Sequence, residues 1–169
     1  EWTNNNTAIG LAANGVGDIP SFVVLGSSVV SEIATIEVTP TYDFNGVTCT
    51  GNPETFTITV NPGAQVDPVA GQVLCVGEST DEILFTTSNT DGSTTYEWTN
   101  NNTAIGLAAS GTGDIPSFTA TNDTASPLVA TIEVIPTYEN GGVTCPGNSE
   151  IFTITINPDA QVNEIDDLV

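Results

Sequence analysis

The sequence predicts an all-β protein made of tandem antiparallel β-sandwich repeats, and three observations support this. First, EWTNNNTAIGLAA begins at Glu1 and again at Glu97, an offset of 96 residues. Aligning residues 1–62 with 97–158 gives 41 identities, which is the signature of a repeat array. Second, short stretches rich in Thr, Val and Ile alternate with Gly, Pro, Asn and Asp, as short strands and turns do. Third, no long apolar pattern of period 3.6 is present, and Thr, Val, Asn and Gly are poor helix formers.

The repeat divides the chain into three predicted segments. Residues 1–62 are the carboxy-terminal part of one repeat, 63–158 form a complete repeat, and 159–169 begin a third. A unit of 96 residues has about the size of an immunoglobulin-like sandwich and can bury a core of its own. The first copy lacks the strands that would precede Glu1, so we expect Trp2 to be incompletely covered or to be covered by another chain.

The first half of the complete repeat contains three expected strands. Residues 72–76 form an opening strand, and 82–87 (EILFTT) form a second strand before a polar turn. Residues 94–99 (TTYEWT) form the third, and the alternation of side chains along a strand puts Tyr96 and Trp98 on one face.

The second half begins with an asparagine turn at 100–102, since Asn tolerates left-handed backbone. Residues 103–107 are expected to form a short edge strand, and 110–114 (SGTGD) a turn. Residues 115–121 form another expected strand, with Pro116 near its start or at a bulge.

Two longer strands complete the repeat. Residues 128–138 alternate with Ile132 facing inward, and residues 151–157 alternate with Phe152 and Ile154 facing inward. We expect the tryptophans to be central core residues, because a sandwich places such a residue on its third strand. The predicted core residues are Trp2, Trp98, Ile132, Phe152 and Ile154.

Residues 23–33 and 119–129 are equivalent segments of the two copies, and they differ at every position. We therefore interpret this segment as a surface connection without core requirements.

The charge excludes several functions. The chain has no Lys, Arg or His and a formal charge of -21. Nucleic acid is excluded as a partner, because phosphate binding needs cationic side chains. Attachment to anionic lipid by a basic patch is excluded for the same reason, and no segment is apolar for long enough to insert into a membrane. We expect no enzyme, because acid–base chemistry would be limited to Asp, Glu, Tyr and Cys, and no carboxylate pair is suggested by the repeat.

The three cysteines fall into two repeat classes. Cys75 lies in the opening strand, whereas Cys49 and its copy Cys145 lie before the last strand. Pairing within one unit would join Cys75 to Cys145 and leave Cys49 with a partner upstream of the chain. The alternatives are a Cys49–Cys75 bond across the unit boundary, or free thiols. A bond closing a loop of this length would stabilise the fold by roughly 4 kcal/mol and would indicate an oxidising compartment.

An ordered set of motifs in the complete repeat resembles a known family. The motifs are CVGEST (75–80), YEWT (96–99), SGTGDIPSF (110–118), ATIEVIPTY (130–138), GGVTCPG (141–147) and FTITINP (152–158). They resemble the PKD-like, immunoglobulin-like repeats of very large surface adhesins of Bacteroidota that are associated with gliding motility. The resemblance implies tandem PKD-like sandwiches, export by the type IX secretion system, and an extracellular location on the bacterial cell surface. It also supports the Cys75–Cys145 pairing.

Two kinds of modification or ligand site are suggested by short patterns. Oxygen-bearing side chains gather at the repeat junctions, and hard cations such as calcium bind such groups. The candidate calcium ligands are Asp67, Asp159, Asn163, Glu164, Asp166 and Asp167, with Asp18 and Asp114 in the glycine-rich turn as a second set. No calcium-loop motif is present, so no cofactor is expected beyond this structural calcium. Asp123-Thr124-Ala125 matches a bacterial O-glycosylation pattern, which makes Thr124 a candidate glycan acceptor.

The expected function is therefore a structural stalk or filament that gives a surface adhesin reach and mechanical stability. Its partners would be neighbouring repeats of the same polypeptide or filament. The rival hypotheses are a glycan- or protein-binding module, using loops such as 23–33 and 119–129, and a self-assembling extracellular subunit that accepts strands from a neighbour. Selective, saturable binding on a glycan array would favour the first rival.

Overall fold

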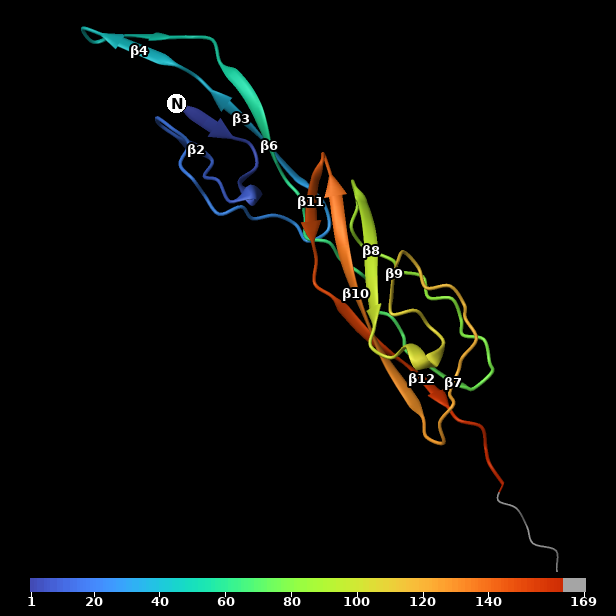
Figure 1. Cartoon of the computed structure of the whole chain (residues 1–169). Coiled ribbons are helices and arrows are strands. Elements are labelled where there is room, and N and C mark those ends of the chain that lie inside the picture. The colour runs from blue at the N-terminus through green and yellow to red at the C-terminus, as the bar shows by residue number, and fades with distance from the viewer. Residues whose placement is uncertain (163–169) are drawn as a thin grey trace, which may run out of the picture. The chain divides into compact units, whose positions relative to one another are not determined.

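The computed structural model describes residues 1–162, and over these the chain forms β-strands, two short 3₁₀ helices and no α-helix (Figure 1). The strands of the first copy are β1 (Trp2–Asn4), β2 (Asn14–Gly15), β3 (Glu32–Val38), β4 (Thr41–Phe44), β5 (Val47–Thr50) and β6 (Glu54–Val60). Those of the second are β7 (Gln72–Cys75), β8 (Ser93–Asn100), β9 (Ser110–Thr112), β10 (Leu128–Asn140), β11 (Val143–Pro146) and β12 (Glu150–Asn157). The helices are η1 (Thr7–Ile9) and η2 (Thr103–Ile105).

The strands form three sheets, and most of their pairings are antiparallel. One sheet has the order β2-β1-β3-β6, a second has the order β7-β12-β10-β8-β9 with β11 also on β10, and β4 pairs with β5 alone. The pair β7–β12 is parallel. The protein is thus all-β with antiparallel sheets, consistent with a β-sandwich.

The chain divides into two compact units. Unit 1 contains Glu1–Ala64 together with Asn89–Thr94 and Tyr138–Pro146. Unit 2 contains Gln65–Ser88, Thr95–Thr137 and the residues from Gly147 onward. Unit 1 is therefore built from residues of both sequence copies.

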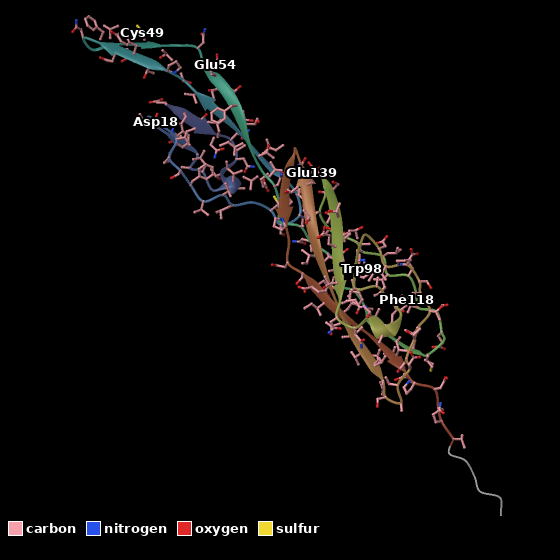
Figure 2. All side chains as sticks on the ribbon, in the orientation of Figure 1. Asp18, Cys49, Glu54, Trp98, Phe118 and Glu139 are labelled. Carbon is pink, nitrogen blue, oxygen red and sulfur yellow. The ribbon has the colours of Figure 1, made fainter. Side chains whose placement is uncertain are left out.

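The core of unit 2 lies between the main sheet and the segments that cross it. Trp98 and Phe118 lie in this unit (Figure 2), Trp98 being buried and Phe118 packing against the core cluster. The Phe85 ring contacts Tyr96 and Phe152 at centroid distances of 5.4 and 6.4 Å, which are favourable separations for aromatic pairs. The residues predicted for the core of this unit, Trp98, Ile132, Phe152 and Ile154, are all buried.

Unit 1 covers its own tryptophan, contrary to our expectation. Trp2 is only 4% exposed, because it packs in a cluster that includes Ile9 and Ile36. Phe56, by contrast, is 46% exposed, whereas its copy Phe152 is 5% exposed. In the second copy the Phe85 ring contacts Phe152, and the position equivalent to Phe85 falls before Glu1.

Several expected elements differ in the structure. Residues 82–87 and 115–121 are not continuous strands and form only isolated bridges, Ile83 with Ile115 and Ser79 with Thr119. Pro116 cannot donate a ladder hydrogen bond, which helps to explain the short pairing there.

The predicted edge strand at 103–107 is wrong, and so is the turn at 110–114. The first is helix η2, since the Asn102 side chain accepts a hydrogen bond from the Ala104 amide and Gly106 ends the helix at a φ of 98°. The second contains strand β9, which pairs with β8.

Candidate functional site

The first and last strands of unit 2 form a parallel pair. Strand β7 lies beside β12 (Figure 1), in a register that begins at Gln72 opposite Ile154 and ends at Cys75 opposite Asn157. Just beyond the ladder, the Val76 amide donates to the Asn157 carbonyl at 3.0 Å. Thus the strand that enters the unit and the strand that leaves it are bonded directly to each other.

Side chains fix both ends of β7. The Gln72 side chain accepts from the Asp81 amide and donates to the Asp81 carbonyl, both at 3.0 Å. The Glu78 carboxylate accepts from the Cys75 amide at 2.7 Å. The Glu78 bond is charge-assisted and therefore stronger than a neutral one. Side-chain hydrogen bonds thus anchor β7 at its start and at its end.

A tight turn after β7 extends this attachment. The Glu78 amide donates to the Cys75 carbonyl at 3.3 Å, and Gly77 has a φ of 85°, as the third position of a type II turn requires. The turn pairs with the opposite segment, because the Gly77 amide donates to the Ala120 carbonyl and the Ala120 amide donates to the Glu78 carbonyl, both at 2.8 Å.

The corresponding position in unit 1 is open. Strand β6 is the copy of β12, but it is the last strand of its sheet and has no strand on its outer side among the described residues. Val24, the copy of the fully buried Ala120, is 57% exposed. The first copy therefore presents the strand edge and the rim that β7 and its turn occupy in the second.

A polar network joins residues of both copies inside unit 1. The Tyr138 hydroxyl donates to the Thr90 carbonyl at 2.8 Å and lies 3.3 Å from the Ser31 hydroxyl. The Asn140 side chain donates to Ser31 Oγ at 2.9 Å, and the Asn61 side chain donates to the Asn140 carbonyl at 2.9 Å. Partly buried groups that satisfy one another in this way favour a single arrangement.

The same hairpin has opposite environments in the two copies. Tyr138 is fully buried, whereas its copy Tyr42 in the β4–β5 hairpin is 67% exposed. Figure 2 shows Cys49 on that exposed hairpin. Similar sequence thus gives different burial, because the second hairpin packs in unit 1 with residues of the first copy.

The predicted disulfide is not formed in the structure. Cys49, Cys75 and Cys145 are all free thiols. The physical reason is the topology: Cys75 lies opposite Asn157, the last residue of β12, whereas Cys145 lies in β11, which precedes the first residue of β12 and pairs with β10. The two cysteines therefore lie on strands that are not neighbours.

The predicted calcium ligands are placed only in part. The Asp67 carboxylate accepts from the Thr86 hydroxyl at 2.7 Å, and Asp159 is exposed. In the second candidate set, Asp18 is exposed and Asp114 accepts from the Phe85 amide at 2.8 Å. Residues 1–162 contain no group of three or more acidic or cysteine side chains with metal-binding geometry. The remaining candidates, Asn163, Glu164, Asp166 and Asp167, lie outside the described residues, so structural calcium stays a prediction.

The candidate glycan acceptor lies in an ordered loop. Thr124 is exposed, and its hydroxyl lies 2.8 Å from the Asn122 side-chain oxygen and 2.7 Å from the Ser126 carbonyl. A glycan on this hydroxyl would replace the proton used in these bonds. Glycosylation of Thr124 therefore stays a prediction, and it would remove a hydrogen bond that the Thr124 hydroxyl donates within the loop.

No family model matches the chain, and no curated protein matches it. Within residues 1–162, no helix has the length and apolar character needed to cross a membrane.

Proposed function

We propose that the chain is a force-bearing section of a stalk or filament in a large bacterial cell-surface adhesin, built from PKD-like, immunoglobulin-like repeats. The proposal includes an extracellular location, export by the type IX system and a non-catalytic role in adhesion or gliding. Support for the family, location and export comes from the ordered motifs of the second copy. Support for the mechanical role comes from the geometry of unit 2.

The observation that carries the mechanical role is the parallel pairing of β7 with β12. A pull on the chain before Gln72 and after Asn157 acts at opposite ends of this pair. The two strands would have to slide past each other, so their hydrogen bonds and side-chain contacts are loaded together instead of one at a time. This arrangement suits a module whose task is to hold its length under tension.

Unit 1 contains residues of both sequence copies, which supports the proposal that consecutive repeats bind each other. Residues of the first copy, such as Ser31 and Asn61, bond residues of the second, such as Tyr138 and Asn140. These hydrogen bonds attach the first copy to the 138–146 segment of the second copy within unit 1, as a partnership between consecutive repeats would require.

Stretching a single chain between its ends tests the proposal. Val76→Pro removes the amide that donates to Asn157, while Pro suits the second position of a type II turn. The variant Val76→Ala keeps that amide and serves as the control for the lost side chain. We expect the step that releases 72–157 to lengthen the chain by roughly 300 Å.

The force at this step should fall more in Val76→Pro than in Val76→Ala. Equal forces in the two variants would contradict the assignment of the β7–β12 pair as the load-bearing element.

A binding module is the second candidate, and exposed apolar side chains in the connection 23–33 favour it. Val23 and Leu25 are 79% and 59% exposed. Selective, saturable glycan binding that Val23→Ser or Leu25→Ser weakens would favour this candidate over a purely structural role.

A further inference from the structure

We propose that the connection 23–33, which differs from its copy at every position, selects the repeat that follows it in the chain. Through Ser31 it favours a following repeat whose β10–β11 hairpin carries a side-chain amide at the position of Asn140, and it discriminates against one that carries Phe there. The inference deepens the proposal that consecutive repeats are partners and rests on that part of the proposed function. It does not depend on the mechanical role of unit 2.

Backbone groups of the connection bind the 89–94 segment of the second copy inside unit 1. The Thr90 amide donates to the Val29 carbonyl at 3.0 Å, and the Asn89 side chain donates to the Ser28 carbonyl at 3.2 Å. Every residue has a main-chain carbonyl, so these two bonds attach the second copy without selecting it. The Thr90 amide therefore reports whether the two copies are attached.

The selective part of this contact is a cluster of side chains around Ser31. The Ser31 hydroxyl donates to Asn61 Oδ1 at 3.0 Å and accepts from Asn140 Nδ2 at 2.9 Å. The Asn61 side chain donates in turn to the Asn140 carbonyl at 2.9 Å. All three residues are half-buried, and one hydroxyl serves here as both donor and acceptor. The Ser31 hydroxyl thus connects the first copy to the hairpin of the second.

Two members of the contact are the same in both copies and therefore cannot distinguish them. Asn61 corresponds to Asn157. Tyr138, whose hydroxyl donates to the Thr90 carbonyl at 2.8 Å, corresponds to Tyr42. We assign Asn61 and Tyr138 to anchoring the hairpin.

The two residues whose side chains bond directly across the contact both differ between the copies. Ser31 corresponds to Pro127, and Asn140 corresponds to Phe44. Neither Pro nor Phe has a side-chain hydrogen-bonding group. Phe at the position of Asn140 would remove the donor that the Ser31 hydroxyl accepts from, and a polar group that loses its partner in a partly buried site is costly. Selection of this kind depends on the penalty for the wrong partner as well as on the bond to the right one.

The test follows hydrogen exchange of the Thr90 amide by NMR in the isotopically labelled whole chain. Exchange of this amide requires its bond to Val29 to open, so its rate measures the fraction of molecules in which the contact is open. The amides of Asn4 and Ile115 each donate to a carbonyl of their own copy and serve as references.

Asn140→Phe is the diagnostic variant, because it gives the second hairpin the residue of the first. We expect exchange of the Thr90 amide to become about tenfold faster, with the reference amides unchanged. In the Ser31→Ala background the same substitution should change the rate by only about twofold, because the discriminating hydroxyl is absent. Asn140→Leu is close to Asn in size and should also give an effect of about tenfold, which would exclude the bulk of Phe as the cause.

Two matched controls remove similar groups outside the cluster. Phe44→Asn makes the reciprocal change at the equivalent position of the exposed hairpin. Ser28→Ala removes a neighbouring hydroxyl but keeps the carbonyl that binds Asn89. Both should leave the exchange of the Thr90 amide within about twofold of the parent chain.

Three results would overturn the selection by Ser31 and leave the partnership of repeats intact. They are equal Thr90 exchange in the parent chain and Asn140→Phe, a tenfold effect that persists in the Ser31→Ala background, and an equally large acceleration at the Asn4 amide. A Thr90 amide that exchanges without protection in the parent chain would instead contradict the attachment of consecutive repeats, and this inference with it.

Discussion

Gly111→Ala should destabilise unit 2, because Gly111 lies directly across the strand pair from Trp98. A Cβ atom at this position would lie 2.3 Å from Trp98 Cζ2 and 2.6 Å from Cε2. Nonbonded carbon atoms prefer about 3.5–4.0 Å, so either the indole or β9 must move by roughly 1 Å. The backbone at Gly111 is not left-handed. Steric overlap is therefore the main cost, apart from the small propensity difference between Gly and Ala.

The expected loss of stability is about 1–3 kcal/mol, the usual range for overpacking of a core. It corresponds to a decrease in melting temperature of roughly 4–8 °C per kcal/mol for a domain of this size. Urea denaturation followed by Trp fluorescence in a Trp2→Phe background would report on Trp98 alone. Gly63→Ala is the control, since its nearest atom would be 3.9 Å away. Equal stability of the two alanine variants would refute the packing of Trp98 against β9.

Three further predictions concern other residues. Tyr138→Phe should lower the free energy of unfolding by about 1 kcal/mol, because the buried Tyr138 hydroxyl donates to a carbonyl. Tyr42→Phe should change the melting temperature little, because Tyr42 is exposed. Equal effects of the two substitutions would contradict the different burial of the two hairpins. Burial raises the pKa of Tyr96 above 10.0, so the contribution of its neutral form to the free energy of unfolding should be fully present below pH 10.0 and should be lost as the pH rises through the raised pKa. Tyr96→Phe should make this alkaline loss of stability smaller. An unchanged loss in the variant would contradict the assignment to Tyr96. Native thiol titration should detect both Cys75 and Cys145, and an intact mass that shows a disulfide would overturn their assignment as free thiols.

Local alternation was sufficient to predict which side chains form the core. Ile132, Phe152 and Ile154 repeat every second residue on paired strands, so their burial follows from strand geometry. The alternation also placed both tryptophans in the core, and both are buried. The expectation that Trp2 would be incompletely covered was wrong, because local residues such as Ile9 cover it.

Features set by distant contacts could not be predicted in this way. Tyr42 and Tyr138 have similar neighbours in sequence but opposite burial. The disulfide prediction assumed that equivalent motif order brings cysteines together, whereas the order of strands separates them. The error at 103–107 had a different origin: Asn102 and Gly106 supply a helix cap and a left-handed end, and this local chemistry was more informative than the apolar spacing.

The difference between the outer edges of β6 and β12 also could not be predicted from the sequence of the strands. The sequence of this strand is almost the same as that of β12, and only the sheet order shows that one edge is paired and the other is not.

The direction of force on the β7–β12 pair provides the most direct test of the mechanical role. In a chain whose other cysteines are replaced by Ser, one handle is attached at Gln161→Cys, after β12. The second handle is attached either at Ala70→Cys, before β7, or at the native Cys75, at the end of β7. The first geometry makes the strands slide, whereas the second peels them apart from the Cys75–Asn157 end.

We expect a clearly higher rupture force in the sliding geometry, because all contacts of the pair are loaded at once. Similar rupture forces in the two geometries would contradict the proposal that this parallel pair bears the load.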